Sequence, residues 1–145
     1  MTKDAPVRVV ADTNVLISGL RWHGPPASLL DHALDRTFSL FGTDELLDEP
    51  AIVLHRPKFA ARLKSRGREP AELVVAYRNI MTLVKPVAVT VPEQLRDLKD
   101  IPVLRCAVAA HAHAIVSGDG HLLGLKEFRG ISIVTPRVFL TALGL

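Results

Sequence analysis

Two aspartates, Asp12 and Asp119, each follow a short apolar segment that is typical of a buried strand, at residues 7–11 and 114–116. In a parallel sheet, ligand sites form beyond the carboxyl ends of the strands. The two carboxylates would therefore converge if these strands are neighbours. Two unit charges about 4 Å apart repel by roughly 4 kcal/mol at an effective dielectric constant of 20. Such a pair needs a proton or a cation.

Two further acids could complete a cation site, since Glu49 lies on or beside a predicted helix and Asp100 lies just before another. Carboxylate oxygens without an accompanying set of Cys and His ligands favour Mg²⁺ or Mn²⁺ over zinc. A divalent ion can polarise a phosphate, generate hydroxide from water and stabilise the leaving oxygen. The residue types therefore predict a divalent-metal site that acts on phosphate, without specifying the substrate.

The segments that must position these acids alternate between strands and helices. We predict strands at residues 7–11, 38–41, 87–91, 114–116 and 131–134. We predict helices from residue 14, at 27–36, 44–54, 58–65, 71–84 and 102–110, after Asp119, and from Pro136. This alternation predicts an α/β fold of three layers (α/β/α) with a mostly parallel central sheet, in a single domain spanning residues 1–145.

Composition supports one globular domain, because 48% of the 145 residues are apolar and 23% are charged. No apolar run approaches the roughly 18 residues that span a bilayer. The first six residues lack the apolar stretch of a secretory signal, and the single cysteine cannot form an internal disulfide. We therefore expect a cytoplasmic protein with no membrane segment.

Basic residues are concentrated in one stretch that contains no acid before Glu69. Its members are Arg56, Lys58, Arg62, Lys64, Arg66 and Arg68. The stretch could be a phosphate-contacting surface or only a solvated helix face, and the sequence leaves both open.

Five segments resemble the PIN-domain family, and they occur in the family's order. The first is residues 9–20, which contains Asp12-Thr13-Asn14, and the others are 44–49, 56–59, 97–100 and 115–119. The resemblance covers nearly the whole chain. It is closest to the branch that contains VapC-type toxins of toxin–antitoxin systems. An Asp-Thr-Asn tripeptide is common by itself, but five segments in order are specific.

The resemblance implies that the first and fourth strands are adjacent, and that the chain hydrolyses single-stranded RNA with an activated water and Mg²⁺ or Mn²⁺. It implies that the catalytic and metal-binding acids are Asp12, Glu49, Asp100 and Asp119. Asn14 would orient a carboxylate or the scissile phosphate, and Thr13 and Ser117 would support the site through their hydroxyl groups.

The same resemblance implies single-stranded RNA and a cognate antitoxin protein as partners. Within the basic stretch, Arg56, Lys58 and Arg62 are possible RNA contacts. We also expect a homodimer, for which the apolar helices at 71–84 and at the C-terminus could supply a face, although they could equally belong to the core.

Each acid also has a structural interpretation. Asp12, Asn14, Asp100 and Asp119 could each cap the helix that follows. Helix capping alone does not explain why acids follow the particular strands that are expected to be neighbours in the sheet. A shared site does explain it. Pro50 should disturb the helix beside Glu49, since proline lacks a donor and displaces the preceding residue from helical angles. We expect a kink there, or two short helices that meet.

Other functions remain possible. The Pro50 and histidine positions are compatible with a catalytically impaired PIN-fold domain that binds RNA or protein. His111 and His113 could suggest zinc, but a zinc site needs three or four ligands. A phosphatase of the haloacid dehalogenase type would require an aspartate where this chain has Asn14. Trp22 could stack on a base or pack on the surface.

Overall fold

The computed structural model describes residues 6–19, 24–95 and 98–145, so Trp22 lies outside the described residues. Within these ranges one sheet has the strand order β3-β2-β1-β4-β6-β5. Only β5 runs antiparallel to its neighbour. The strands are β1 (Arg8–Ala11), β2 (Ser39–Gly42), β3 (Thr82–Leu83), β4 (Ala114–Val116), β5 (Glu127–Phe128) and β6 (Ile131–Val134).

The central strands β1 and β4 pair in parallel, with Val10 beside Ile115 and Ala11 beside Val116. This confirms that the first and fourth predicted strands are adjacent. Because the paired residues Ala11 and Val116 end their strands, the loops after them begin at the same edge of the sheet. That edge receives Asp12 and Ser117.

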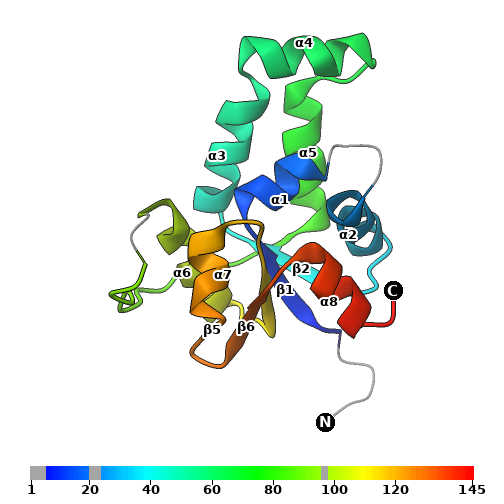
Figure 1. The fold of residues 1–145 in the computed structure, drawn as a ribbon. Helices are drawn as coiled ribbons and strands as arrows, with labels where there is room; N and C mark the ends of the chain where they lie inside the picture. Colours follow the sequence, from blue (N-terminus) through cyan, green and yellow to red (C-terminus); the bar gives the residue numbers. More distant parts are fainter. Residues whose placement is uncertain (1–5, 20–23, 96–97) are drawn as a thin grey trace.

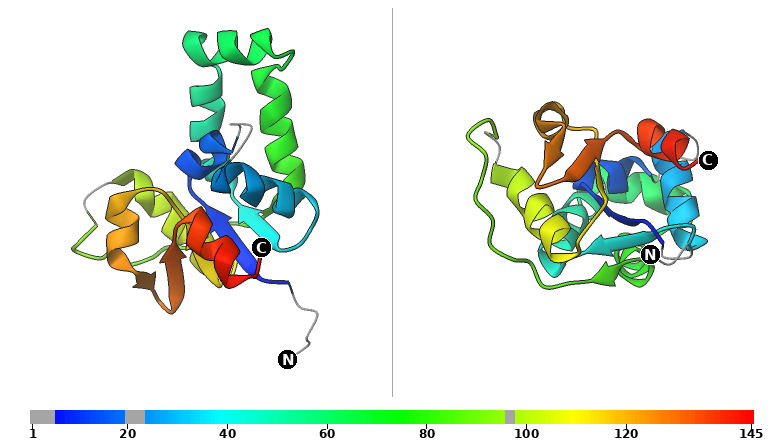
Figure 2. Two further views of the ribbon diagram at one scale, coloured as in Figure 1. Left: turned by 45° about the vertical axis from the view of Figure 1, so that its right-hand side comes forward. Right: turned by 90° about the horizontal axis from the view of Figure 1, so that it is seen from below.

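Helices cover both faces of the sheet, as Figures 1 and 2 show. They are α1 (Thr13–Ser18), α2 (Pro25–Leu34), α3 (Asp44–Leu54), α4 (Pro57–Ser65), α5 (Pro70–Ile80), α6 (Ile101–Ala109), α7 (Gly120–Leu125) and α8 (Pro136–Ala142), with a 3₁₀ turn η1 (Leu98–Asp100). The predicted three-layer α/β/α fold with a mostly parallel sheet is therefore confirmed.

The hydrophobic core consists of two clusters, one on each face of the sheet, and alternate residues of β1 belong to different clusters. Val9 packs with residues of α1, α2, α5 and α8, whereas Val10 packs with residues of α6 and α7. Neither valine is exposed to solvent. Successive strand residues point to opposite faces, so a strand buried on both faces is apolar at every position.

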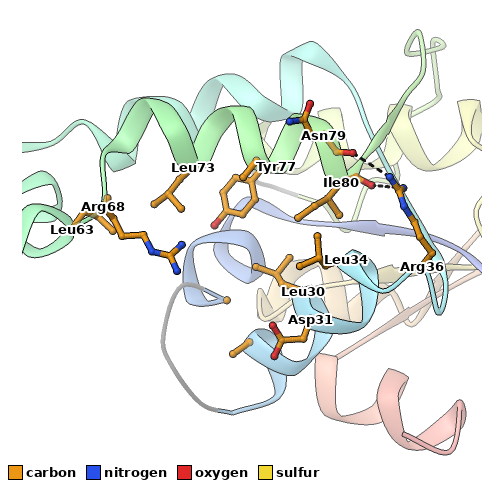
Figure 3. Close-up of a pocket in the computed structure, with 13 residues that line it drawn as sticks. Leu30, Asp31, Leu34, Arg36, Leu63, Arg68, Leu73, Tyr77, Asn79 and Ile80 are labelled. Carbon is orange, nitrogen blue, oxygen red and sulfur yellow. Dashed lines mark hydrogen bonds between the residues drawn. The ribbon is translucent and has the colours of Figure 1, made fainter. Parts of the chain in front are cut away.

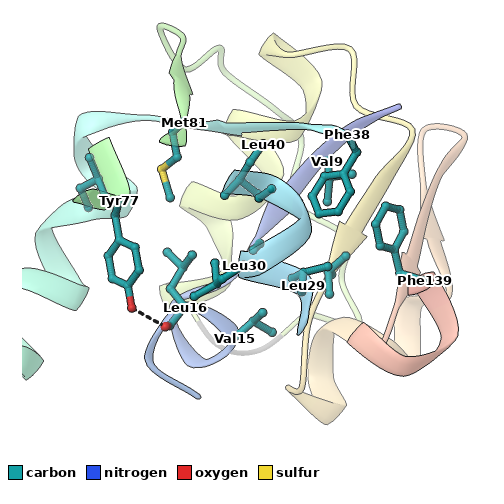
Figure 4. Packing of buried hydrophobic residues seen from close by; sticks show 14 of the residues in the cluster. Val9, Val15, Leu16, Leu29, Leu30, Phe38, Leu40, Tyr77, Met81 and Phe139 are labelled. Atoms are coloured by element: carbon teal, nitrogen blue, oxygen red, sulfur yellow. Dashed lines mark hydrogen bonds between the residues drawn. The ribbon is translucent and has the colours of Figure 1, made fainter. Parts of the chain in front are cut away.

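The first cluster contains two contacts that fix helices around the sheet (Figure 4). Phe38 and Phe139 pack edge to face, with ring centroids 5.2 Å apart. The hydroxyl of Tyr77 on α5 donates a hydrogen bond of 2.6 Å to the backbone oxygen of Leu16 on α1. This buried bond joins α5 to the short helix that follows Asp12.

Three helices form an arm that rises above the carboxyl edge of the sheet. Figures 1 and 2 show α3 and α5 rising from the body of the protein, with α4 across their far end. Pro57 and Pro70 occupy the first turns of α4 and α5, where the missing N–H donor has no helical partner to lose.

Two of the predicted elements are wrong on this side of the sheet. Residues 87–91 form no strand, and the helix predicted to end at residue 84 ends at Ile80. Thr82 and Leu83 instead pair with the end of β2, and Val84 N–H donates to Gly42 O at 2.9 Å. Pairing with β2 therefore ends the helix, and β3 forms the edge of the sheet beyond β2.

Pro50 does not divide α3, which runs without a break from Asp44 to Leu54. The prediction of two short helices that meet at Glu49 is wrong. One side of α3 is buried at Leu46, Leu47, Pro50 and Leu54. This spacing follows the helical period, so burial of the whole side offsets the hydrogen bond that proline cannot donate.

Among the described residues, no helix combines the length and apolar character needed to cross a bilayer.

Candidate metal centre

A cavity of about 190 Å³ lies at the carboxyl edge of the sheet. It brings together all four acids singled out from the sequence, together with Thr13 and Asn14. Its lining residues are Asp12, Thr13, Asn14, Glu49, Lys99, Asp100, Val103 and Asp119. They come from the β1–α1 junction, α3, the η1–α6 junction and the β4–α7 junction.

Asp12 is buried, with 5% of its surface exposed, and both carboxylate oxygens are oriented by hydrogen bonds. Oδ1 accepts the Val15 N–H at 2.9 Å, which caps α1, and Oδ2 accepts the hydroxyl of Ser117. Burial raises the pKa of Asp12, and the nearby charge of Asp119 raises it further, against the opposing effect of both hydrogen bonds. Asp12 is thus a helix cap and a cavity acid at once.

Ser117 connects the two strand-end aspartates. Its fully buried hydroxyl donates to Asp12 and accepts the backbone N–H of Asp119 at 2.9 Å. Asp119 is partly buried, and its Oδ1 caps α7 by accepting the His121 N–H at 2.8 Å. Cap and cavity roles coincide here too, because both helices begin directly at the sheet edge.

The other two acids enter the cavity from helices. Asp100 is buried, with 6% of its surface exposed, and its side chain does not cap α6, so the cap interpretation is wrong for this residue. Glu49 is exposed on α3 at the cavity. Asn14 does not cap α1 either, because Asp12 does.

Lys99 lines the same cavity and was not among the predicted site residues. Its position beside Asp100 in the 97–100 segment was the available signal. An ammonium group here adds a positive charge next to the carboxylates, and it can bind a phosphate oxygen as a point charge.

The acids supply the oxygen ligands that Mg²⁺ and Mn²⁺ prefer, so their chemistry fits such an ion. In the described part of the chain, however, no three His, Cys, Asp or Glu side chains are grouped closely enough to hold a metal ion as they stand. Ion binding would have to draw the carboxylates together. Exposed Glu49 and partly buried Asp119 have more freedom to move than Asp12.

The histidines do not form a zinc site in the described residues. His113 Nδ1 accepts the backbone N–H of Arg8 at 2.9 Å, so this nitrogen is engaged in joining the β4 side to β1. His111 lies at a positive φ of 51° after α6. The zinc interpretation therefore finds no support in the geometry.

A larger cavity, of about 660 Å³, lies between α2 and α5, away from the acids (Figure 3). Leu30, Leu34, Leu73, Tyr77 and Ile80 give it a mainly apolar lining. Arg36 closes one end by donating to the backbone oxygens of Asn79 and Ile80. The lining includes one carboxylate, Asp31, with Arg36 and Arg68, so it lacks the cluster of four acids that lines the smaller cavity.

Replacing Ser117 tests the link between the two aspartates. We expect Ser117→Ala to lower Mn²⁺ affinity about 10–100-fold, because the serine orients a ligand candidate. Loss of the buried hydroxyl should also destabilise the fold by about 1–3 kcal/mol. Calorimetric titration and thermal melting measure the two effects. Ser132→Ala, on an exposed serine of β6, is the control. Equal Mn²⁺ affinities of the two variants would contradict this role.

A model of the PIN domain matches residues 8–121. No curated protein matches the chain. The matched residues run from β1 to the start of α7 and include every acid of the cavity. The chain therefore belongs to the PIN-domain family, whose members are generally nucleases.

Proposed function

We propose that the protein is an endoribonuclease that hydrolyses phosphodiester bonds of single-stranded RNA with Mg²⁺ or Mn²⁺. The observation that carries the proposal is the convergence of four carboxylates on one cavity at the carboxyl edge of the sheet. Burying ionised carboxylates such as those of Asp12 and Asp100 costs folding free energy unless a cation or another partner compensates the charge. Family membership adds the expectation of phosphodiester chemistry.

In this proposal Asp12, Asp100 and Asp119 hold the ion, with Glu49 completing the set. A bound divalent ion supplies a lowered pKa for attacking water and neutralises charge on the phosphate. Among the protein's own residues, Asp12 is the acid best prepared to act as a ligand. The hydrogen bonds from Val15 N–H and Ser117 favour its ionised form and fix its direction.

The remaining cavity residues act on the substrate. Lys99 binds a non-bridging phosphate oxygen, and Asn14 orients a carboxylate or the scissile phosphate through its amide. Thr13 lines the cavity beside them and offers a hydroxyl donor. These groups position the phosphodiester for attack by water, which is the larger part of catalysis in such reactions.

We further propose that the protein is the toxin of a toxin–antitoxin pair, acting in the cytoplasm as a homodimer. The support is the resemblance of residues 9–20 and the four following segments to VapC-type toxins. A cognate antitoxin would inhibit the enzyme by keeping RNA from the acidic cavity. For the dimer, exposed apolar residues on the arm, Ile52 and Val75, are available as contacts.

A second candidate is a PIN-fold domain that binds RNA or protein without cleaving it. The observation in its favour is that the described acids are not grouped at metal-binding distances. Metal binding separates the two candidates. Saturable Mn²⁺ binding that Asp12→Asn abolishes supports the nuclease, and absence of binding by a folded protein supports the second candidate.

A cleavage assay tests the leading proposal. End-labelled single-stranded RNA is incubated with the purified protein in Mg²⁺, in Mn²⁺ and in EDTA. We expect cleavage with either ion, none in EDTA, and recovery when Mn²⁺ is restored. Duplex RNA and single-stranded DNA of the same sequence report substrate class. Cleavage that persists in EDTA would rule out the metal mechanism.

A further inference from the structure

The tip of the helical arm carries a concentration of positive charge that the cavity chemistry does not use. Six basic residues fall between positions 56 and 68, and no acid occurs between Glu49 and Glu69. All six are exposed. We define the basic tip as the four on or next to α4: Arg56, Lys58, Arg62 and Lys64.

The charges of the basic tip are directed to solvent. Within the arm, α4 turns buried Leu63 and half-buried Phe59 and Ala60 away from solvent. Lys58 and Arg62 are four residues apart and so share one helix face, where like charges disfavour the helix. The ion pairs of Arg78 with Asp44 and of Arg105 with Glu45 involve no residue of the basic tip.

The basic tip stands over the same edge of the sheet as the acidic cavity. Helix α3 spans the distance, because Glu49 lines the cavity and the helix ends five residues later at Leu54. At 1.5 Å per residue this separation is about 7.5 Å along the axis. Arg56 then occupies the position directly before α4, without a capping hydrogen bond from its side chain. Figure 1 shows α3 leading upward from the sheet to α4.

The surface chemistry favours a polyanion over an apolar partner. None of the large exposed hydrophobic residues in the described chain lies on α4, where the apolar side chains face the arm. A protein interface would be expected to have an apolar or aromatic centre, and a membrane-binding helix an exposed apolar face. Clustered Lys and Arg without either feature are typical of phosphate contact.

We propose that the basic tip binds backbone phosphates of the RNA strand on one side of the bond being cleaved. This inference rests on the proposed ribonuclease activity and adds a positioning surface to it. RNA with one phosphodiester in the cavity would extend along α3 to α4. The basic tip would then raise affinity for longer substrates without taking part in the chemical step.

The test uses the triple variant Lys58→Gln/Arg62→Gln/Lys64→Gln. A matched control, Arg8→Gln/Lys85→Gln/Arg137→Gln, removes the same charge from exposed residues elsewhere. Binding of a fluorescent single-stranded RNA is measured by anisotropy over a salt series. Three lost phosphate contacts should reduce the slope of log K against log salt by about 2. Affinity should fall at least about 10-fold, and the control should change far less.

Kinetics provide the second readout. With a long RNA we expect the triple variant to raise KM and leave kcat unchanged. With a dinucleotide, whose single phosphodiester must occupy the cavity and leaves no backbone phosphate for α4, the variant and the wild type should cleave equally. Circular dichroism checks folding, and the single variant Arg62→Gln repeats the binding test with an expected slope change of about 0.7.

Several outcomes would overturn the proposal. One is equal affinity and salt slope for the triple variant and its control, and another is an equal KM of the triple variant and the wild type with the long RNA. Failure of the wild type to cleave any RNA, together with RNA binding that still depends on the basic tip, would contradict the proposed activity but support RNA binding by the basic tip. If the triple variant cleaved long RNA as well as the wild type does, the proposed activity would stand and the role of the basic tip would be contradicted.

Discussion

Asp12→Asn is expected to reduce RNA cleavage by about 100-fold or more while leaving the fold intact. The variant removes one anionic oxygen from the acidic cavity without changing side-chain size. Its amide oxygen can still accept the Val15 N–H that caps α1. The amide nitrogen would face Ser117, whose hydroxyl can accept as well as donate. The loss should therefore reflect charge and ligand character, measured as kcat/KM with Mn²⁺.

The matched control for this variant is Asp48→Asn. Asp48 is an exposed aspartate on α3, next to Glu49, and it does not line the cavity. Its replacement should leave cleavage within about twofold, because surface charges away from a site have small effects. If Asp12→Asn and Asp48→Asn cleaved RNA at the same rate, Asp12 would have no place in the chemistry.

Mn²⁺ is expected to raise the melting temperature of the wild type by roughly 5–10 °C at a concentration 100 times its Kd. An ion that binds only the folded state stabilises it by about 2.7 kcal/mol under that condition. Asp12→Asn should show little of this shift. Differential scanning fluorimetry with and without EDTA measures it. A wild-type melting temperature that ignored Mn²⁺ at every concentration would contradict the metal centre.

The effect of pH follows from the raised pKa of Asp12. Protons compete with the ion, so the Mn²⁺ shift should shrink as pH falls toward that pKa. Without metal, a carboxyl group with a pKa raised above its ordinary value of 3.8 stabilises the fold below that value. This contribution is lost as pH rises through the raised pKa. Asp12→Asn, which does not ionise, avoids the loss.

Metal-free Asp12→Asn should therefore melt at or above the wild-type temperature at pH 7, with a smaller difference near pH 4. The comparison distinguishes a functional acid from a structural one. A variant much less stable than the wild type at pH 7 without metal would mean that the Asp12 charge serves mainly to cap α1.

The central strands and the positions of the acids that follow them were predictable because the same residues determine both. Val9 and Val10 are buried on opposite faces, and such a continuous apolar run is distinctive in sequence. The aspartate after such a strand must lie at the sheet edge. Asp12 and Asp119 could therefore be placed from sequence, and adjacency of β1 and β4 brings their loops together.

The errors occurred where tertiary pairing outweighed local preference. Residues 87–91 are rich in β-branched residues but form no strand, whereas Thr82 and Leu83 pair with β2. The two-residue strand β5 is too short to produce a periodic pattern. At Pro50, the buried side of α3 maintains a helix that proline disfavours locally. None of these outcomes can be read from a short window of sequence.

The sequence left open whether the aspartates cap helices or line a site, and the structure shows that two of them do both. Asp12 and Asp119 each cap a helix and line the cavity, so capping does not exclude a functional role. Lys99 joins the site because the η1–α6 junction reaches the same edge. Its contribution depends on three-dimensional proximity to acids that are distant in sequence.

The most direct test of the metal centre is a crystal soaked in Mn²⁺ near pH 7, with anomalous scattering used to locate the ion. We expect a peak in the acidic cavity, ligated by Asp12, Asp100 and Asp119, with Glu49 turned toward it. A crystal of Asp12→Asn soaked in the same way should lose the peak or show it weakened. A cavity without manganese in the wild type, or manganese bound only at His111 and His113, would contradict the proposed metal centre.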